Sequence, residues 1–342
     1  MENSHPMILA LTDGKAGHET QTQGLVQLLN IDHDHQIEWI SIQMPSKWLY
    51  RWIRFLIRFT FDPHWINYFF SPAELQRFQC KDIRYIISAG GNTLIANAVL
   101  KRYLAQQLVK NIVASSLRGI PATYFDVVFT IHQQQDHPPY LYYPIAPNKM
   151  TANRLTQSQA REHLGIQQAQ QVISILIGAS TKHVGIGTTE HWSMIIQKIK
   201  KQLPQAQLLI TTSRRSSLQF EESLKTQLQK VLSARDQLIC VVHGQNCDVK
   251  DFIQAADWVM VSADSTSMVA EVLMAEKKLL VAQLGKINDV RIREQLNDLE
   301  HQHWLKKINI EDDFNDINQY LNSINPLAHS KHLQIKLNQH LN

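Results

Sequence analysis

The feature that most constrains the fold is an alternation of short β-rich runs with longer helical patterns, and it occurs in two series. In the first series we predict strands and helices in alternation: strands 6–11, 37–42, 83–88, 111–114 and 125–130, and helices 18–29, 46–60 and 92–106. The second series begins with a strand in 171–180 and continues in the same way: strands 207–211, 238–242, 257–261 and 279–282, and helices 189–202, 217–232 and 266–275. This alternation is typical of parallel sheets that are covered by helices.

The length of the chain indicates more than one domain, because 342 residues is long for a single hydrophobic core. The polar, glutamine-rich segment 132–170 is interpreted as the connection between two halves. We therefore predict an α/β fold of two Rossmann-like, doubly wound domains that face each other across a cleft. Their expected ranges are 1–150 and 151–325, and a C-terminal helix in 326–342 is expected to pack back on the first domain.

Composition excludes several classes of protein. A hydrophobic content of 44% with 19% charged residues is typical of a packed globular protein, and a net charge of +4 is too small to indicate a nucleic-acid partner. Three cysteines, odd in number and widely spaced, favour a reducing compartment over a disulfide framework. Residues 1–6 do not resemble a signal peptide, and no apolar run is long enough to span a bilayer. We expect a cytoplasmic location.

The loop between the first strand and the first helix carries several chemically active side chains. Its residues are Asp13-Gly14-Lys15-Ala16-Gly17-His18, followed by Glu19. Backbone amides at the start of a helix can receive an anion, and glycine lets the backbone approach a ligand. Asp13, His18 and Glu19 are alternative general bases for a hydroxyl nucleophile. The competing interpretation is a tight turn whose polar residues lie in solvent.

A second loop of this kind, "SAGGNT", follows the strand at 83–88. Gly90, Gly91 and Asn92 lie where backbone amides can face a ligand. The alternative is a glycine turn with an Asn or Thr helix cap.

The second half contains two loops with phosphate-binding character. In "LIGAST", Gly178, Ser180 and Thr181 follow a strand and leave room for a phosphate. In "TTSRRSS", the adjacent arginines Arg214 and Arg215 can form paired hydrogen bonds to a phosphate. Solvated loops and simple helix caps are the alternatives. A weaker candidate is His243, which follows another strand and can contact a nucleobase or sugar.

The most specific arrangement follows the strand at 257–261. Ser262-Ala263-Asp264-Ser265-Thr266-Ser267 opens a helix, and Glu271 lies on that helix seven residues after Asp264. A glutamate at this position can accept hydrogen bonds from two ribose hydroxyls. The alternative is a polar capping box beside a buried acid, although a helix needs only one capping hydroxyl.

Together, "LTDGKAGHETQTQGL", "SAGGNT", "LIGAST", "TTSRR" and "SADSTSMVAE" resemble, in the same order, the mitochondrial fission family found in plants and many bacteria. The resemblance covers most of residues 6–285. One departure is "LIGAST", which stands where the family often has a doubled glycine.

The resemblance implies a function, because this family is similar to glycosyltransferases of the GT-B fold, in particular the enzyme that adds N-acetylglucosamine to a lipid-linked muramyl peptide. It implies that Glu271 binds the ribose and that Ser265, Thr266 and Ser267 line the diphosphate. It also implies that Gly178, Ser180 and Arg214 complete the donor site, while residues 14–18 face the acceptor and the sugar. Residues expected at the acceptor side are Gly14, Lys15, Gly17, Gly90, Gly91 and Asn92.

The implied activity is transfer of a hexosyl or N-acetylhexosaminyl group from a nucleotide sugar, expected to be UDP-linked, to a lipid-linked or other envelope saccharide. Neither a metal ion nor a further cofactor is expected. Two alternatives remain open. One is an epimerase or hydrolase that acts on the nucleotide sugar alone, and the other is a non-enzymatic scaffold recruited to a membrane.

Segment 47–70 has the most unusual composition in the chain. Lys47, Arg51, Arg54 and Arg58 share one helix face, and the segment also contains three tryptophans and five phenylalanines. This pattern is typical of a helix that lies at the surface of an anionic membrane, here the inner leaflet. The alternative is a large core helix whose arginines form its wet edge.

Overall fold

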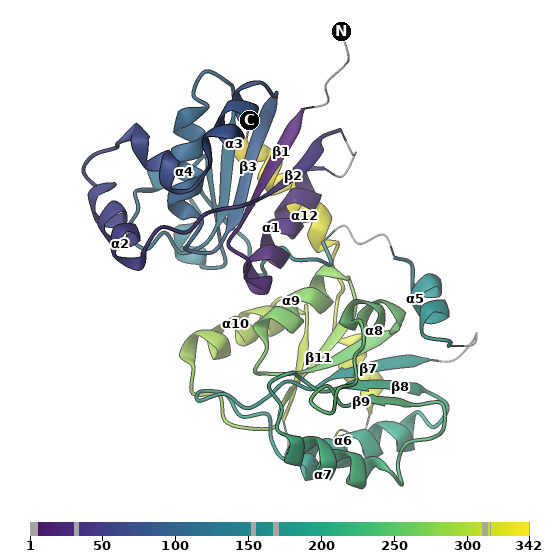
Figure 1. Cartoon of the computed structure of the whole chain (residues 1–342). Coiled ribbons are helices and arrows are strands. Elements are labelled where there is room, and N and C mark those ends of the chain that lie inside the picture. The colour runs from purple at the N-terminus through teal and green to yellow at the C-terminus, as the bar shows by residue number, and fades with distance from the viewer. Residues whose placement is uncertain are drawn as a thin grey trace. The chain divides into compact units, whose positions relative to one another are not determined.

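The computed structural model describes residues 6–30, 34–151, 155–166, 171–309, 314 and 316–341. It divides into two compact units, which we call unit 1 (Met1–Ala152 with Ser330–Asn342) and unit 2 (Asn153–His329). Each unit contains one six-stranded sheet in which every paired strand is parallel to its neighbour, as Figure 1 shows. The predicted α/β class with two doubly wound halves is confirmed.

The sheet of unit 1 has the strand order β2-β1-β3-β4-β5-β6. Its strands are β1 (Met7–Thr12), β2 (Gln36–Ser41), β3 (Ile83–Ala89), β4 (Lys110–Ala114), β5 (Val127–Thr130) and β6 (Tyr140–Tyr142). Its helices are α1 (Ala16–Leu29), α2 (Lys47–Leu56), α3 (Pro72–Gln79), α4 (Leu94–Tyr103) and α12 (His329–Leu341), with 3₁₀ turns at Pro63–Tyr68, Ala122–Tyr124 and Gln133–Gln135.

Both faces of this sheet are buried, which explains why β1 reads as an uninterrupted apolar run. Met7, Leu9 and Leu11 belong to the hydrophobic core that also takes in side chains of α2, α3 and α4. The alternate residues Ile8 and Ala10 are equally buried, and because successive strand residues point to opposite faces they lie on the side of α1. Figure 1 shows α2 and α4 on one side of the sheet and α1 and α12 on the other.

The sheet of unit 2 has the order β12-β11-β10-β7-β8-β9. Its strands are β7 (Val172–Leu176), β8 (Gln207–Thr211), β9 (Gln237–Ile239), β10 (Trp258–Ser262), β11 (Lys278–Gln283) and β12 (Lys306–Asn309). Its helices are α5 (Gln157–His163), α6 (Thr189–Gln202), α7 (Leu218–Leu228), α8 (Val249–Ala255), α9 (Thr266–Met274), α10 (Val290–His301) and α11 (Ile317–Asn322).

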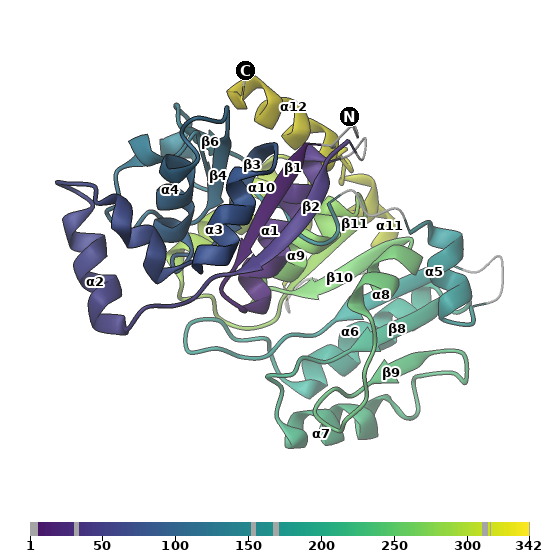
Figure 2. The ribbon, with the colours of Figure 1, turned by 45° about the horizontal axis from the view of Figure 1, so that its top comes forward.

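Unit 2 is also packed on both faces of its sheet, as Figure 2 shows. On one face, α6, α7 and α11 bury side chains such as Trp192 and Leu224 against β7, β10 and β11. Helix α8 contacts β7, and Ser174 of that strand donates a 2.6 Å hydrogen bond to the carbonyl of Phe252. The order of the strands places the carboxyl ends of β7 and β10 side by side at the centre of the sheet.

Segment 132–170 contains more than the predicted connection. Strand β6 adds an edge to the sheet of unit 1, and α5 packs on α8 of unit 2. Residues 152–154 and 167–170 of this segment lie outside the described residues. We did not predict α3, α8 or β12 from the sequence, because their short apolar patterns are interrupted by polar residues.

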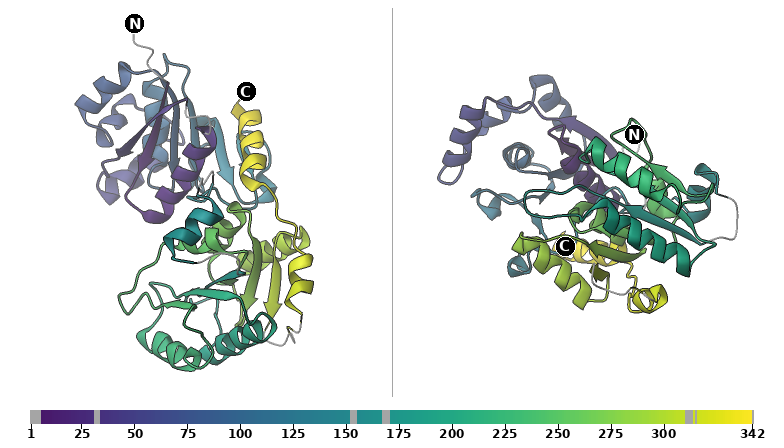
Figure 3. Two further views of the ribbon diagram at one scale, coloured as in Figure 1. Left: turned by 90° about the vertical axis from the view of Figure 1, so that its right-hand side faces the viewer. Right: turned by 90° about the horizontal axis from the view of Figure 1, so that it is seen from below.

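The C-terminal helix α12 belongs to unit 1, where it lies along β6. Lys336 donates a 3.3 Å hydrogen bond to the carbonyl of Tyr142, and Nε2 of His340 lies 3.2 Å from the carbonyl oxygen of Tyr140. Figure 3 shows this helix beside the teal strands of unit 1, far from it in sequence.

The predicted aromatic helix at 46–60 is shorter than expected, and the segment 47–70 does not behave as one surface. Helix α2 ends at Leu56, and a 3₁₀ turn begins at Pro63. Trp65, Phe69 and Phe70 are buried in the core of unit 1. The prediction that segment 47–70 faces a membrane is therefore wrong for Trp65, Phe69 and Phe70, whereas Tyr68 is 44% exposed. No helix in the described part of the chain is long and apolar enough to cross a bilayer.

Two glycines of α1 provide a test of its packing. A Cβ atom on Gly24 would lie 2.3 Å from the backbone nitrogen of Asn148, whereas a Cβ atom on Gly17 meets nothing within 4 Å. Because backbone cannot move aside easily, we expect Gly24→Ala to destabilise unit 1 by about 1–3 kcal/mol. Thermal unfolding followed by calorimetry measures this effect.

Gly17→Ala is the matched control in the same helix. It adds a good helix former in open space, so the free energy of unfolding is expected to stay unchanged or to rise by up to about 1 kcal/mol. Equal unfolding midpoints for the two variants would contradict the described contact between α1 and residues 147–148.

Candidate active site

A buried carboxylate organises the loop after β1. The side chain of Asp13 has no exposed surface, and its oxygens lie 3.0 and 3.1 Å from Nδ1 of His18. Asn92, from the loop after β3, donates a 2.8 Å hydrogen bond to the same carboxylate, and the backbone amide of Lys15 donates another at 3.3 Å. Two predicted loops are thus joined at one carboxylate, because the carboxyl ends of the neighbouring strands β1 and β3 meet at this edge of the sheet.

These donors also determine the charge state of Asp13. Burial raises the pKa of the Asp13 carboxyl, but the hydrogen bond and charge of His18, with the hydrogen bonds from Lys15 and Asn92, outweigh burial and bring the pKa below its usual value. Asp13 is therefore an anion at neutral pH. Since its oxygens are closed off from solvent, it positions a neighbouring group and does not itself meet a ligand.

That neighbouring group is His18, whose side chain is 27% exposed. With Nδ1 turned to the Asp13 carboxylate, the neutral ring carries its proton on Nδ1 and leaves Nε2 as an acceptor. No other described residue makes a hydrogen bond to Nε2. The ring packs on Gly90, where a Cβ atom would lie only 2.2 Å from Nδ1, so only glycine fits there. The φ angle of Gly90, +85°, is also in the region that favours glycine.

The other residues of the first loop have simpler surroundings. Glu19 accepts a 2.7 Å hydrogen bond from the hydroxyl of Thr12, which itself accepts from the amide of Gly14. Gly14 and Gly17 face open space, and the side chain of Lys15 is 60% exposed and 3.8 Å from Asp13. Of the three candidate bases, His18 combines a fixed orientation with a partly exposed ring whose Nε2 has no hydrogen-bond partner among the described residues.

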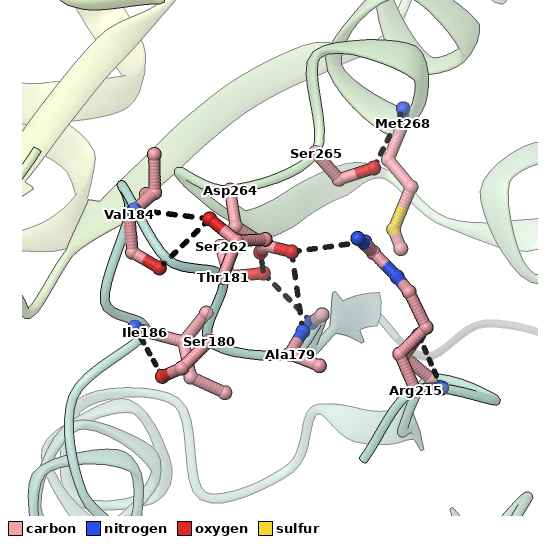
Figure 4. A network of polar contacts seen from close by, with 12 residues as sticks. Ala179, Ser180, Thr181, Val184, Ile186, Arg215, Ser262, Asp264, Ser265 and Met268 are labelled. Carbon is pink, nitrogen blue, oxygen red and sulfur yellow. Dashed lines mark hydrogen bonds and ion pairs between the residues drawn. The ribbon is translucent and has the colours of Figure 1, made fainter. Parts of the chain in front are cut away.

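In unit 2, the carboxylate of Asp264 occupies the space beneath the loop after β7, as Figure 4 shows. It accepts hydrogen bonds from the hydroxyl of Ser262 at 2.6 Å and from the amide of Ala179 at 3.1 Å. The hydroxyl of Ser262 in turn accepts from the amide of Gly178 at 2.7 Å. A Cβ atom on Gly178 would lie 2.1 Å from Oδ1 of Asp264, which explains the glycine.

The side chain of Asp264 has no exposed surface, so we assign it a positioning role. Its one exposed partner is Arg215, whose guanidinium lies 3.2 Å from Oδ2 and is drawn across the loop in Figure 4. Arg214, which the sequence reading preferred, is exposed, and no described acidic residue pairs with it. The sequence named both arginines as phosphate ligands but placed only Arg214 in the donor site, whereas Arg215 is the one that contacts Asp264. The two adjacent arginines are visible in the sequence, but only the structure shows which of them reaches Asp264.

The hydroxyls of the predicted phosphate loop form hydrogen bonds to the backbone of the same loop. Ser180 accepts a 3.2 Å hydrogen bond from the amide of Ile186, and Thr181 bonds the backbone of Val184. They shape the loop 178–186. Its exposed positions include Ser180 and Thr181 themselves, so a ligand can still reach them.

Helix α9 begins as predicted. Ser265 is its N-cap and accepts from the amide of Met268 at 3.4 Å, and its hydroxyl lies 3.2 Å from that of Ser267. The first amides of a helix have no intrahelical partner and can receive an anion. Thr266 is half-buried and Ser267 is exposed. Glu271, further along the helix, is half-buried.

A third buried carboxylate, Glu221 of α7, holds the loop after β9. It accepts hydrogen bonds from the hydroxyl of Thr212, from the amides of Val242 (3.0 Å) and His243 (3.1 Å), and from Nδ1 of His243 at 2.6 Å. Burial raises the pKa of Glu221, but these hydrogen bonds outweigh burial and lower it. His243, 36% exposed, therefore has its Nδ1 held and its Nε2 turned toward the surface.

Glu221, His243 and Cys240 have ligand atoms within 4.8 Å of one another, which is close enough for a metal ion. Their chemistry does not fit one. Every acceptor position of the Glu221 carboxylate is already filled by a donor, and burial together with the charge of Glu221 raises the pKa of the Cys240 thiol, which disfavours the thiolate that a metal requires. The expectation of a metal-independent protein stays a prediction.

Two doubly wound units with polar loops at the carboxyl ends of parallel strands place the chain among two-domain α/β proteins of the GT-B fold, a fold that it shares with a solved structure described below. Within that class, residues 16–332 match the model of the family described as mitochondrial fission ELM1, and the chain belongs to this family. The resemblance drawn from the loop motifs is confirmed. No curated protein matches the sequence.

Solved structures with a similar fold are distant in sequence. The Staphylococcus aureus MnaA–UDP complex is 13% identical, with 98% of each chain covered and a TM-score of 0.50. Acinetobacter baumannii MurG is 13% identical, with 98% of this chain and 95% of that chain covered and a TM-score of 0.45. The Neisseria meningitidis UDP-GlcNAc 2-epimerase bound to UDP-GlcNAc is 11% identical, with 97% and 99% covered and a TM-score of 0.46. At these identities the similarity shows the fold alone.

The buried carboxylate of Glu221 gives a prediction about pH. Glu221→Gln places an NH₂ group against backbone donors, so we expect it to lower the free energy of unfolding by about 1–3 kcal/mol at pH 7. Because the folded-state pKa lies below the ordinary 4.5, this stabilisation is complete above that value and is lost as the pH falls through the folded-state pKa. Urea unfolding from pH 7 down to about pH 3 measures both effects.

The neighbouring Glu222→Gln is the matched control, because the Glu222 side chain is 69% exposed; we expect it to change little at any pH. A deficit for Glu221→Gln that grows as the pH falls would contradict the proposed charge state. Added zinc or EDTA is expected to leave the wild-type midpoint unchanged.

Proposed function

We propose that this protein is a glycosyltransferase that moves a sugar from a nucleotide-sugar donor, expected to be UDP-linked, to a saccharide acceptor of the cell envelope that is linked to lipid. The observation that carries the proposal is the pair of Asp13 and His18, a buried carboxylate that holds an exposed imidazole at the carboxyl end of β1. Membership of a GT-B-like family and the anion-binding loops of unit 2 support it.

In this proposal unit 1 binds the acceptor and supplies the base. Nε2 of His18 accepts the proton of the acceptor hydroxyl as that oxygen attacks the anomeric carbon of the donor. Asp13 keeps the ring in the required tautomer and stabilises the imidazolium that forms. Asn92 donates a hydrogen bond to Asp13, and Gly90, which has no Cβ atom, leaves room for the ring of His18.

Unit 2 binds the nucleotide sugar. The amides at the start of α9 and the guanidinium of Arg215 stabilise the charge that develops on the departing diphosphate, in place of a metal ion. Asp264 and Gly178 hold the loop after β7 in position, and Glu271 accepts hydrogen bonds from the ribose. His243 is oriented to contact the base or the sugar.

The proposed site at the membrane is the outer side of α2, which we call the aromatic face: Trp48, Trp52, Phe55, Leu56 and Phe59. Trp48 is 74% exposed and Phe59 is 76% exposed, although both are large apolar side chains. The rings pair along the surface, Trp48 with Trp52 and Phe55 with Phe59. On the inner side, Tyr50, Ile53 and Ile57 are buried in the core.

Charge supports an anionic lipid surface as the occupant of the aromatic face. Lys47, Arg51, Arg54 and Arg58 flank it, and no described acidic residue forms an ion pair with any of the four. Exposed aromatic rings beside unpaired cations are typical of a helix that binds anionic headgroups. Figures 1 and 2 place α2 at the periphery of unit 1, away from its strands.

The catalytic proposal is tested by calorimetric binding of a panel of nucleotide sugars, followed by assays of transfer to lipid-linked saccharide. We expect His18→Ala to lower kcat by about 10²–10⁴-fold, because a general base contributes this much, and to leave the donor Kd unchanged. Glu271→Ala and Arg215→Ala are expected to raise the donor Kd at least about tenfold, as lost hydrogen bonds to charged groups do.

Glu19→Gln is the control for His18, because Glu19 bonds Thr12 and lies next to the proposed base. Donor turnover without any acceptor would favour the epimerase or hydrolase. A protein that binds no nucleotide sugar in the panel would refute the enzyme and leave the scaffold.

Membrane binding is tested by co-sedimentation with vesicles of phosphatidylcholine alone or with phosphatidylglycerol. Wild type is expected to bind the anionic vesicles, and Trp48→Ser with Phe59→Ser to lower that affinity at least about tenfold through lost apolar burial. Trp39→Ser on β2, which removes an exposed tryptophan elsewhere in unit 1, is the control and should bind as wild type does. Equal binding to both kinds of vesicle would contradict the role of the cations.

A further inference from the structure

A cavity of about 540 Å³ in unit 1 lies outside the residues discussed above. It is formed at the carboxyl ends of β4 and β5, by the loop 115–120 and by residues 129–135, and it reaches Gln21 of α1. Since β4 lies next to β3 in the sheet, the cavity is at the same edge as Asp13 and His18. The sequence analysis did not single out either loop.

The polar groups that line this cavity are suited to an anion. The lining contains no aspartate or glutamate, and its polar residues are Gln21, Ser115, Ser116, Arg118, Thr130, His132, Gln135 and Tyr140. Thr130 and Gln135 are hydrogen-bonded to each other, at 3.0 Å. The hydroxyl of Ser115 donates a 3.0 Å hydrogen bond to the carbonyl of Ser116. The lining side chains with donors suited to an anion are therefore Arg118, His132 and Ser116.

Arg118 is held in an unusual way. Its backbone has a φ of 50°, which is uncommon for any residue other than glycine and costs conformational energy. Its carbonyl accepts a 3.3 Å hydrogen bond from Arg58. Its guanidinium packs on Gly91, where a Cβ atom would lie 2.2 Å from Cζ, and no described acidic residue pairs with it. The cation is therefore fixed in place without a counter-ion.

Gly91 is fixed in turn by Tyr50 of α2, whose hydroxyl donates a 2.5 Å hydrogen bond to the Gly91 carbonyl. Burial raises the pKa of Tyr50 to about 12; the charges of Arg118 and Arg54 act to lower it, and that of Asp13 acts to raise it. Tyr50 is therefore a neutral donor at neutral pH, close to both the arginines and Asp13.

The cavity and the proposed base are adjacent. The ring of His18 packs on Gly90 and the guanidinium of Arg118 on Gly91, two backbone positions about 3.8 Å apart. Gln21, which lines the cavity, lies three residues after His18 on the same face of α1. Arg118 and His18 therefore pack on neighbouring backbone positions, and Arg118 and Gln21 line the cavity beside His18.

We infer that this cavity binds a phosphate group carried by the acceptor, through the fork of Arg118 with Ser116 and His132, and so places an acceptor hydroxyl at His18. A guanidinium that presents two parallel N–H groups suits phosphate oxygens, and the hydroxyl of Ser116 and the imidazole of His132 add single donors. The inference rests on the proposed function for the identity of the acceptor, but not for the existence of the phosphate site.

The test is hydrogen–deuterium exchange of the full chain, read by mass spectrometry, with inorganic phosphate, glycerol 3-phosphate or short-chain phosphatidic acid below its micelle concentration. Each is expected to protect residues 115–120 and 130–135. Stronger protection by the lipid indicates a lipid-linked phosphate, and equal protection by glycerol 3-phosphate indicates a soluble one. The readout is local, so nucleotide binding in unit 2 does not affect it.

Arg118→Gly is the decisive variant, because glycine adopts a φ of 50° without strain and the fold should persist. We expect it to weaken phosphate protection at least tenfold, while Arg84→Met, an exposed arginine of β3, leaves it unchanged. Unaltered protection in Arg118→Gly, or equal protection by acetate, would overturn the inference. Phosphate protection in a protein that transfers no sugar would instead refute only the proposed function.

Discussion

Three buried carboxylates determine the shape of the carboxyl edges of both sheets. Asp13, Glu221 and Asp264 have no exposed side-chain surface, and each receives donors from a loop that follows a strand. An ionised carboxylate in a buried position is very costly unless its oxygens are hydrogen-bonded. The loops must therefore keep their N–H groups turned inward. Each carboxylate also holds a side chain that reaches solvent: His18 at Asp13, His243 at Glu221 and Arg215 at Asp264.

The sequence was sufficient for the architecture because parallel strands buried on both faces leave continuous apolar runs, such as β1 and β10, between helical patterns. It also identified most loops that matter, since side chains that follow parallel strands collect at one edge. Asp13 and Asn92 were named in separate loops, and the structure joins them at 2.8 Å. Their meeting depends on the adjacency of β1 and β3, which periodicity alone does not reveal.

The direction of individual side chains was less accessible. The composition of segment 47–70 does not distinguish Trp48 from Trp65. In the structure Trp48 is exposed and Trp65 is in the core, because the chain turns between α2 and the 3₁₀ segment that follows. Nor does a local pattern say that Arg215 rather than Arg214 reaches Asp264. These outcomes are decided by residues from distant strands, and Asp264 itself lies far from both arginines in sequence.

Helix α2 links two proposals that arose from separate observations. Its outer side is the aromatic face, while its inner side supplies Tyr50, which holds Gly91. The helix is followed by Arg58, which holds the carbonyl of Arg118. A membrane bound on the outer side, as proposed, would therefore contact the same helix whose inner side supports the cavity beside Arg118. If the acceptor is anchored in lipid, the two proposals place its phosphate at Arg118 and its hydroxyl at His18 within one unit, so that recognition of the surface and of the acceptor would depend on a single helix.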